Sequence, residues 1–330
     1  MINEILIFRT DRIGDLLISC PAVLSLKEKI KDSRITLITS KYNYDYARSL
    51  NIFDDIRIIP RKNFIEKIKF IKKLSKIKFD YIFIFDGKER SIITSIFIKS
   101  KIKTALMQKK RYNFLYNFLG LKLIDDDNKT NLVELYQKVL DTSNLNIKIS
   151  NFDFLKIKKN NGFSSNILTK NYILIHLDEK WIKSLYINKY KSINPTYQDF
   201  INFLKIISQK NEILITTGLV NYNLIDDIKN NFFKKVNEKI YFKDINNKKI
   251  YLIFKPSLDD IESLIANAKT LISCHGAITH IANSYDIEIL DIIDESKKNW
   301  YPRFSSYMSN YNFFYRNNFD LLSKEIISKI

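Results

Sequence analysis

The sequence predicts an α/β fold of two lobes, each built on a parallel β-sheet. Its 330 residues exceed what a single hydrophobic core usually supports, which favours two domains of ordinary size. Short apolar runs typical of buried strands alternate with longer helical patterns, as in a parallel sheet covered by helices. A polar stretch around residues 149–166 interrupts this rhythm, and a second series of strands follows it. We therefore expect one lobe in residues 1–160 and the other in residues 161–330.

The first lobe is predicted to begin with four strands, at residues 5–8, 35–39, 56–59 and 81–85. Apolar residues between the first two strands have a mostly helical spacing, although Pro21 should kink that helix or restart it. Between residues 63 and 77 apolar side chains alternate with lysines, which predicts an amphipathic helix with a basic outer face.

The second lobe repeats the pattern, with strands predicted at residues 172–175, 213–216, 271–273 and 287–293. One helix should start at Thr196, and another after Ser257, whose spacing to Asp260 is that of a capping box. The final stretch, residues 301–330, is a candidate for crossing back onto the first lobe. In a fold of two such lobes, we expect a ligand in the cleft between them, at the carboxyl ends of the strands.

The chain is strongly basic, with 54 Lys and Arg against 36 Asp and Glu, a net charge of +18. Such a surplus attracts phosphate-rich partners. We do not expect nucleic acid, because the basic residues are spread along the chain without zinc-finger spacing or a basic-region heptad. An anionic sugar nucleotide, an anionic membrane face and a compositional bias without functional meaning are the alternatives left open.

Cysteine usage and hydropathy predict the compartment. Cys20 and Cys274 are far apart and lack CxxC spacing, so we expect neither a disulfide framework nor a zinc site. The N-terminus has the pattern of a strand, and no uncharged apolar run approaches the roughly 18 residues that a membrane span needs. We expect a cytoplasmic protein that contacts the inner face of the membrane peripherally at most.

A distinctive motif follows the first strand, where the chain reads Arg9-Thr10-Asp11-Arg12-Ile13-Gly14-Asp15 and enters a helix. Gly14 lets the backbone approach a ligand closely. Asp15 lies near the helix start, where a carboxylate either caps the helix or faces a ligand. The residues alone leave both roles open.

This motif, with the Cys-Pro-Ala-Val-Leu-Ser-Leu-Lys of residues 20–27, resembles the opening of glycosyltransferase family 9, the bacterial ADP-heptose:lipopolysaccharide heptosyltransferases. The resemblance implies the GT-B architecture, two Rossmann-like lobes with parallel sheets facing a central cleft. It also implies that Asp15 is the general base, since a carboxylate can take the proton of an acceptor hydroxyl as its oxygen attacks an anomeric carbon. Asp11 and Arg12 would order the loop.

A second loop in the first lobe, residues 85–91, resembles the family's Asp-x-x-Gly-x-x-Arg-Ser segment more loosely. Lys88 and Arg90 are its candidates for contact with the acceptor. The alternative is a polar turn whose residues cap the following helix.

In the second lobe, the strand that starts at residue 172 leads into His176 and a charged loop. The family has a lysine in this loop that contacts the donor diphosphate, and Lys180 is the candidate here, with Lys183 as its competitor. A cation stabilises the charge on a departing diphosphate, which is the role of a metal in other glycosyltransferases. A solvated surface lysine is the alternative.

The strand at residues 213–216 leads into Thr217 and Gly218, which match the family's glycine-containing turn beside the nucleotide. Family members often carry an acid just downstream that holds the ribose. Here Asn221 and Asn223 stand in that region, so recognition of the ribose by a carboxylate is not expected there.

The last motif, residues 264–282, resembles the family's Leu-Ile-x-x-Ala-x-x-x-Ile-Ser-x-Asp-Thr-Gly-x-x-His-Leu-Ala, where a helix N-terminus faces the donor phosphates. His280 aligns with the family's histidine. His275, Gly276 and Ala277 stand in place of Asp-Thr-Gly, so an imidazole replaces a carboxylate that contacts the donor. That departure leaves the donor sugar open.

The resemblance therefore implies an inverting, metal-independent glycosyltransferase without a cofactor. It would move heptose or another sugar from a nucleotide-diphosphate donor, such as an ADP-linked sugar, to a hydroxyl of a cell-envelope glycan such as lipopolysaccharide. The acceptor would be a glycolipid or a polysaccharide. The alternative is a catalytically inactive sugar-nucleotide-binding protein of the same fold, which the altered Asp-Thr-Gly motif favours.

Overall fold

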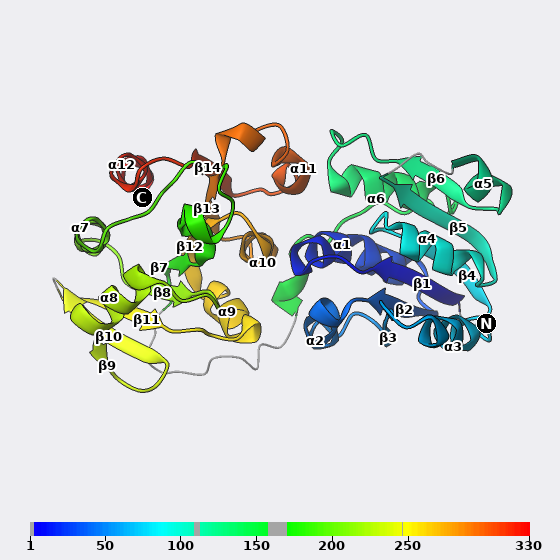
Figure 1. The fold of residues 1–330 in the computed structure, drawn as a ribbon, viewed down its shortest axis with the longest axis horizontal. Helices are drawn as coiled ribbons and strands as arrows, with labels where there is room; N and C mark the ends of the chain where they lie inside the picture. Colours follow the sequence, from blue (N-terminus) through cyan, green and yellow to red (C-terminus); the bar gives the residue numbers. More distant parts are fainter. Residues whose placement is uncertain (1–2, 109–112, 158–169, 246) are drawn as a thin grey trace. The chain divides into compact units, whose positions relative to one another are not determined.

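The computed structural model describes residues 3–108, 113–157, 170–245 and 247–330 (Figure 1). The chain divides into two compact units, one formed by Met1–Phe154 with Pro302–Tyr307 and the other by Leu155–Tyr301 with Met308–Ile330. The predicted lobe boundary between residues 160 and 161 lies outside the described residues. Of the C-terminal stretch, only Pro302–Tyr307 groups with the first unit.

The first unit is built on a six-stranded parallel sheet with the strand order β3-β2-β1-β4-β5-β6 (Figure 1). Its strands are β1 (Asn3–Arg9), β2 (Ser33–Thr39), β3 (Asp55–Ile58), β4 (Phe79–Ile84), β5 (Ser100–Met107) and β6 (Lys122–Asp125). Its helices are α1 (Ile13–Lys29), α2 (Lys41–Ser49), α3 (Phe64–Leu74), α4 (Glu89–Ile96), α5 (Asn113–Phe118), α6 (Leu132–Asp141) and α11 (Pro302–Ser305).

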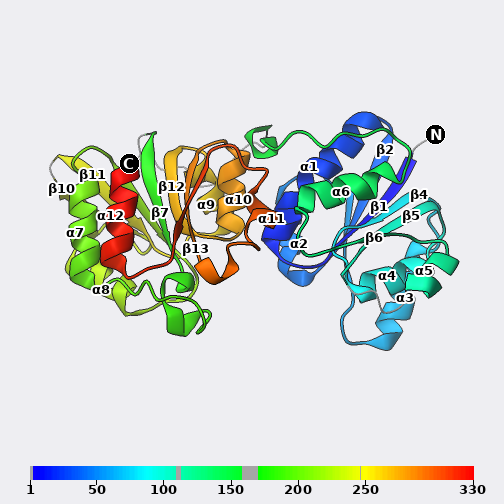
Figure 2. The same ribbon diagram turned by 90° about the horizontal axis from the view of Figure 1, so that it is seen from above.

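The helices of the first unit cover both faces of its sheet. The chain runs from β1 to β3 in one direction across the sheet and from β3 to β6 in the other, so right-handed crossovers place the two sets of helices on opposite faces. Figure 2 shows α1 and α6 on one face and α3, α4 and α5 on the other. On the face covered by α3, α4 and α5, one side chain from each helix packs in a cluster with Leu6 and Phe8 of β1, namely Leu74, Ile92 and Tyr116.

Helix α1 runs through Pro21 without a break, so the predicted restart at this proline does not occur. Pro21 lacks the N–H that would bond to the carbonyl of Leu17, yet it is buried together with its neighbours. The hydroxyl of Ser19 and the thiol of Cys20 donate to the carbonyl of Leu16, at 2.7 and 3.3 Å. Packing of this buried face against the sheet outweighs the loss of one helical hydrogen bond.

The second unit is built on an eight-stranded sheet with the order β14-β13-β12-β7-β8-β11-β10-β9. Its strands are β7 (Tyr172–Leu177), β8 (Ile213–Thr217), β9 (Lys234–Lys235), β10 (Ile240–Ile245), β11 (Lys248–Ile253), β12 (Ala268–Cys274), β13 (Glu288–Ile293) and β14 (Tyr311–Tyr315). Its helices are α7 (Tyr197–Ile207), α8 (Asn223–Asn231), α9 (Leu258–Ile265), α10 (Ala277–Ser284) and α12 (Phe319–Lys329), with short 3₁₀ turns η3 (Glu179–Trp181), η4 (Lys183–Leu185) and η5 (Glu295–Lys297).

This second sheet is mixed, because antiparallel pairs at one edge extend the predicted parallel strands. Strands β9 and β10 run antiparallel to their neighbours, whereas the other six strands pair in parallel. Asn247, which directly precedes β11, has a φ of 60°, the left-handed value that is common in hairpin turns. The antiparallel strands extend one edge of the sheet and leave its parallel centre intact.

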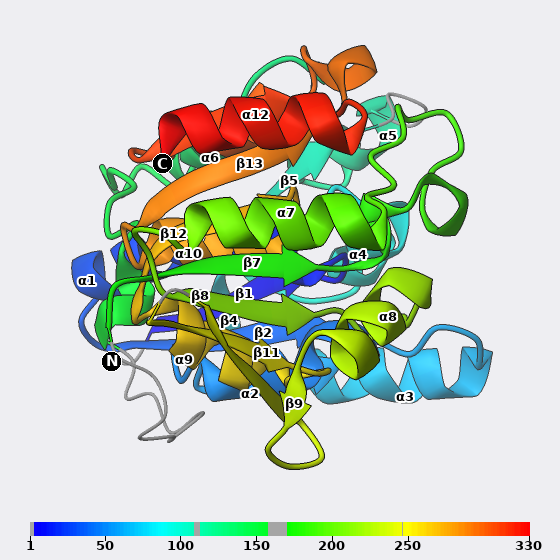
Figure 3. The same ribbon diagram turned by 90° about the vertical axis from the view of Figure 1, so that its left-hand side faces the viewer.

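Helices cover both faces of the second sheet as well. Figures 2 and 3 show α7 and α12 on one face and α9 and α10 on the other. The hydroxyl of Thr196 caps α7 through the N–H of Asp199. At the start of α9, Ser257 and Asp260 form the predicted capping box, which is confirmed.

Candidate active site

The loop after β1 places Asp15 in the first turn of α1. Asp15 is the third residue of the helix and is half-buried. Its Oδ2 accepts a hydrogen bond from the backbone N–H of Arg12 at 3.3 Å. Arg12 itself is exposed and directly precedes the helix, while Gly14 lies in the first turn. The carboxylate therefore caps the helix start through one oxygen.

A buried guanidinium fixes the main chain beneath Asp15. Arg9 is 2% exposed and donates to the backbone carbonyls of Asp15 and Phe85, at 2.8 and 2.6 Å, and to the hydroxyl of Tyr136. Its Nη1 also lies 3.3 Å from Oδ2 of Asp11. Sequence reasoning read Arg9 only as part of the motif, because its partners Phe85 and Tyr136 are distant in the chain.

Asp11 lies beside Arg9 in this loop. Burial raises the pKa of Asp11 more than the neighbouring Arg9 lowers it, and the carboxylates of Asp15 and Asp86 raise it further. Its Oδ1 is buried and accepts no hydrogen bond from the described residues. Three carboxylates, those of Asp11, Asp15 and Asp86, therefore act on the guanidinium of Arg9.

The second predicted loop ties the first one down. Oδ2 of Asp86, which is 1% exposed, accepts from the N–H and the hydroxyl of Thr10 at 3.2 and 2.5 Å, and from the hydroxyl of Ser91 at 2.7 Å. Arg90 donates to the carbonyl and the hydroxyl of Thr10, at 3.0 and 2.7 Å. Lys88 lies at the N-cap of α4 and donates its backbone N–H to Asp86. Asp86 and Arg90 thus hold Thr10, in the loop that leads into α1 and Asp15.

In the second unit, the carboxyl ends of β12, β7 and β8 are neighbours, so the loops after these strands meet. Lys180 follows β7, and its Nζ lies 2.7 Å from Oδ2 of Asp178 and 3.4 Å from the carbonyl of Cys274. Burial lowers the pKa of Lys180, but attraction and hydrogen bonding from Asp178 outweigh it and raise the pKa to about 12. The site therefore holds a permanent, partly buried cation.

Two glycines let these loops approach each other. A Cβ on Gly276 would lie 2.6 Å from Nζ of Lys180, and a Cβ on Gly218 would lie 2.8 Å from Cβ of Asp178. Gly276 directly precedes α10, whose first-turn N–H groups at Ala277 and Ile278 have no partner within the helix. The ammonium of Lys180 thus lies beneath the N-terminal turn of α10, a combination suited to an anion.

His275 is held by a buried acid that sequence reasoning missed. Its Nδ1 lies 2.5 Å from Oδ2 of Asp291, which is 0% exposed and belongs to β13. The hydroxyl of Tyr311 donates to the same oxygen at 2.8 Å. The imidazole of His275 is therefore paired with a carboxylate from the neighbouring strand.

The other two histidines are buried. Burial lowers the pKa of His280 well below its ordinary value, and the nearby His275 lowers it further. Burial also lowers the pKa of His176 to about 4, against the opposing attraction of Asp178. Nδ1 of His176 lies 3.0 Å from the hydroxyl of Thr216, so this side chain supports the strand ends. Both histidines are neutral at pH 7.

Arg316, just after β14, braces the loop that carries Lys180. It is 3% exposed, and it donates to the backbone carbonyls of Lys180 and Lys191 at 2.6 and 2.9 Å. Lys183, the competitor of Lys180, begins the short turn η4, and its backbone N–H donates to Asn194. The Asp178 pairing and the Arg316 brace distinguish Lys180 from the many surface lysines of this chain.

A hollow of about 380 Å³ opens beside these loops. It is lined by residues that follow β7 and β8, among them Ile182, Tyr222, Asn223 and Asp227. The hydroxyl of Tyr222 is buried without a hydrogen-bond partner among the described residues. Burial raises the pKa of Tyr222 well above its ordinary value, and the charge of Asp178 raises it further.

The remaining predicted residues of this turn have structural contacts. Thr217 is buried and its hydroxyl accepts from the N–H of Lys255 at 2.8 Å, while the N–H of Gly218 donates to Leu177. The side-chain amide of Asn221 donates to Asp226 at 2.7 Å. Asp226, on α8, is therefore an acid close to Asn221.

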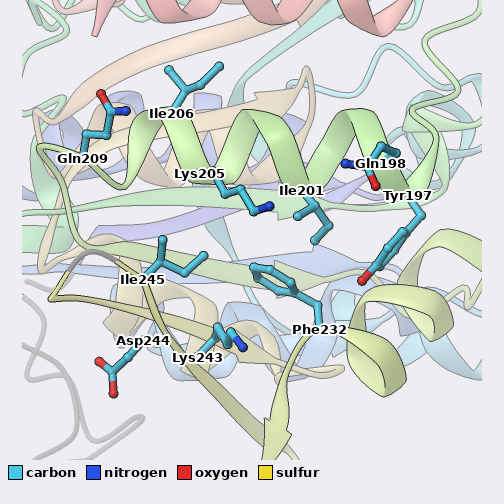
Figure 4. Close-up of a pocket in the computed structure, with 10 residues that line it drawn as sticks. All are labelled: Tyr197, Gln198, Ile201, Lys205, Ile206, Gln209, Phe232, Lys243, Asp244 and Ile245. Atoms are coloured by element: carbon cyan, nitrogen blue, oxygen red, sulfur yellow. The ribbon is translucent and has the colours of Figure 1, made fainter.

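A larger hollow of about 530 Å³ lies between α7 and β10 (Figure 4). Figure 4 shows its lining, which includes Ile201, Lys205, Phe232 and Lys243 and none of the residues that the sequence motifs single out. Within the described ranges, no group of three or more His, Cys, Asp or Glu side chains could hold a metal ion. The described part of the chain also has no helix long and apolar enough to cross a membrane.

Comparison by sequence finds a distant relative. No protein-family model matches the chain. An uncharacterised protein of Buchnera aphidicola subsp. Schizaphis graminum (strain Sg) is 26% identical over 281 residues, which are 74% of this chain and 28% of that protein. The chain thus spans little more than a quarter of the length of the curated relative that it matches.

Several solved structures match nearly the whole chain. The glycosyl transferase family 9 structure from Veillonella parvula DSM 2008 has a TM-score of 0.64 at 14% identity and covers 99% of this chain and 89% of its own. The E. coli heptosyltransferase WaaC with ADP has a TM-score of 0.63 at 12% identity, with 99% and 97% covered. The UDP-GlcNAc 2-epimerase from Methanocaldococcus jannaschii has a TM-score of 0.59 at 14% identity, with 100% and 92% covered. The likeness confirms the predicted GT-B fold of two α/β units.

Proposed function

We propose that this chain is an inverting glycosyltransferase that moves a sugar from a nucleotide-diphosphate donor to a hydroxyl of a cell-envelope glycan. The same fold also occurs in an epimerase, so the fold alone does not assign the activity. The observation that carries the proposal is the partly buried Lys180 ammonium beneath the N-terminal turn of α10. The motif that ends in Asp15 and its resemblance to glycosyltransferase family 9 support the same assignment.

The diphosphate of the donor would bind at Lys180 and the first turn of α10. A diphosphate carries negative charge that grows as it departs, and a fixed ammonium with helix N–H groups stabilises that charge. The pairing with Asp178 holds the ammonium in place and keeps it charged. This arrangement would do the work of a divalent cation, so we propose a metal-independent reaction without a cofactor.

The nucleoside would occupy the hollow beside the loops that follow β7 and β8. The buried hydroxyl of Tyr222 offers a hydrogen bond there, and Asp227 on α8 offers a carboxylate for ribose hydroxyls. An ADP-linked sugar is one candidate donor. The family resembled here has an acid that contacts the donor where this chain has His275, oriented by Asp291. The donor sugar in the proposed reaction is therefore either heptose or a different sugar.

Asp15 would act as the general base. Its carboxylate takes the proton of the acceptor hydroxyl while the hydroxyl oxygen forms a bond to the anomeric carbon. The bond from that carbon to the diphosphate oxygen breaks on the opposite side, which inverts the configuration. The acceptor would be a glycolipid or polysaccharide such as lipopolysaccharide. The two cysteines are buried and free, which fits the cytoplasm.

A thermal-shift screen against a panel of nucleotide sugars tests the proposal. A donor at 100 times its dissociation constant stabilises the protein by about 2.7 kcal/mol, which raises the melting temperature measurably. We expect a shift with at least one donor and with the matching nucleoside diphosphate. The absence of any shift would contradict the proposal. Binding without turnover, in the presence of acceptor glycolipids, would favour the catalytically inactive sugar-nucleotide-binding protein instead.

A further inference from the structure

Exposed apolar side chains are concentrated on three helices of the first unit. Among the described residues, 20 large apolar side chains are exposed, and nine of them lie on α3, α4 and α5 or directly after α4 and α5. These three helices make up a small part of the chain, so the concentration is far above an even distribution. The nine residues, named here the apolar face, are Phe64, Ile65, Ile68, Ile93, Phe97, Phe114, Leu115, Phe118 and Leu119.

The three helices cover the same face of the first sheet, as Figures 2 and 3 show from two directions. Their inward side chains, among them Leu74, Ile92 and Tyr116, already fill the layer against the strands. The apolar face therefore points outward from a core that is complete without it. Its aromatic members are well exposed, with Phe114 at 87%, Phe118 at 80% and Phe64 at 73%.

Cations accompany the apolar face. Between residues 61 and 78 the chain has eight basic residues and one acid, Glu66. The four lysines of α3 are all exposed, namely Lys67, Lys69, Lys72 and Lys73. A helix that exposes Phe and Ile among lysines has the character of a segment that lies in the plane of a membrane interface. Because the lysines of α3 are positively charged, they favour an anionic surface as the partner that covers the apolar face.

We propose that the apolar face of α3, α4 and α5 is a docking surface for an anionic lipid bilayer. The phenylalanines of α5 and the apolar residues at the start of α3 enter the boundary between headgroups and acyl chains. The lysines of α3 contact anionic headgroups. This inference goes beyond the proposed function and does not rest on it, although binding to a membrane would bring the protein to a glycolipid acceptor.

Vesicle flotation with the full chain tests the proposal. We expect the protein to float with vesicles of phosphatidylethanolamine and phosphatidylglycerol and to bind vesicles of phosphatidylcholine much more weakly. The Phe114→Ser/Phe118→Ser variant should lose at least about tenfold in affinity for the anionic vesicles, because it removes apolar surface that would leave water. Replacing the four lysines of α3 with glutamine should cost about fivefold per lysine near the surface and reduce the salt dependence.

Matched variants on the second unit serve as controls, since Ile206→Ser/Leu321→Ser and Lys210→Gln/Lys234→Gln remove exposed side chains of the same kinds. They should bind vesicles like the unaltered chain. Failure of the unaltered chain to bind anionic vesicles would overturn the proposal, as would equal losses in the control variants. It would also be overturned if the phenylalanine variant abolished a dimer seen by light scattering while vesicle binding was unchanged.

Discussion

Replacement of Lys180 by methionine separates the structural and the ligand-binding contributions of this side chain. Methionine keeps a similar apolar stem but removes the ammonium that lies 2.7 Å from Oδ2 of Asp178. The Asp178 side chain is 7% exposed and that of Lys180 is 17% exposed, so the change leaves a carboxylate in a poorly solvated position. It also removes the cation that we propose for the donor diphosphate.

The expected magnitude follows from the geometry. Breaking a buried ion pair from one side costs about 3–5 kcal/mol. The partial exposure of Lys180 and the remaining N–H donor to Asp178 reduce this cost, so we expect Lys180→Met to lower the free energy of unfolding by about 2 kcal/mol. The double variant Asp178→Asn/Lys180→Met has no unpaired charge and should recover most of that loss. Neither variant regains the cation, so both should bind a nucleoside diphosphate about 10- to 100-fold more weakly.

Urea denaturation measures the stability of the three proteins, and calorimetric titration with ADP and UDP measures their affinity. A double variant that recovered both stability and nucleotide affinity would refute the reasoning, because Lys180 would then serve only to neutralise Asp178. Unchanged stability in the single variant would refute the account of the buried pair.

Three further predictions concern neighbouring features. Gly276→Ala adds a Cβ 2.6 Å from Nζ of Lys180, which must displace the ammonium. The φ of Gly276 is 174°, so alanine does not strain the backbone there. Calorimetry should show nucleotide affinity falling about tenfold, while the free energy of unfolding decreases by less than about 1 kcal/mol. Asp86→Asn replaces one of the two carboxylate oxygens, which accept from Thr10 and from the start of α4, by an N–H donor. Urea denaturation should show that the free energy of unfolding falls by about 2–3 kcal/mol. An unchanged free energy of unfolding would contradict the anchoring role of Asp86. His176 is buried and its pKa is about 4, so between about pH 4 and 6.5 its imidazole binds a proton in the unfolded state but not in the folded state. The free energy of unfolding should therefore rise with pH over this range, by up to about 3 kcal/mol. A His176→Gln variant whose stability rises with the same slope as that of the unaltered chain would contradict this.

Local sequence signals predicted β1 to β4, β7, β8, β12 and β13 with ends close to those observed, but they gave no strand at β5, β6, β11 or β14. The apolar run at residues 35–39 became the buried part of β2, and the capping box at Ser257 began α9. Of the kink or restart expected at Pro21, the restart did not occur, because burial of α1 is a tertiary effect that local propensity does not contain. The antiparallel β9 and β10 were missed because residues 231–249 are rich in Lys and Asn and lack clear alternation.

Contacts between distant residues could not be predicted. Asp178 directly follows a buried strand, and that position was the available signal for its role beside Lys180. Asp291 lies within an apolar run and Arg316 follows one, so neither has a local pattern that links it to His275 or Lys180. Only the order of the strands brings these side chains together.

The most direct test of the proposed reaction is Asp15→Asn, measured with the donor that the thermal-shift screen identifies and a glycolipid extract as acceptor. Asparagine keeps an oxygen that can accept the Arg12 N–H, so the helix start and the stability should be preserved. We predict that transfer falls about 10²- to 10⁴-fold while donor affinity is unchanged, because the donor contacts lie on other residues. Transfer near the unaltered rate would contradict the role of Asp15 as the base.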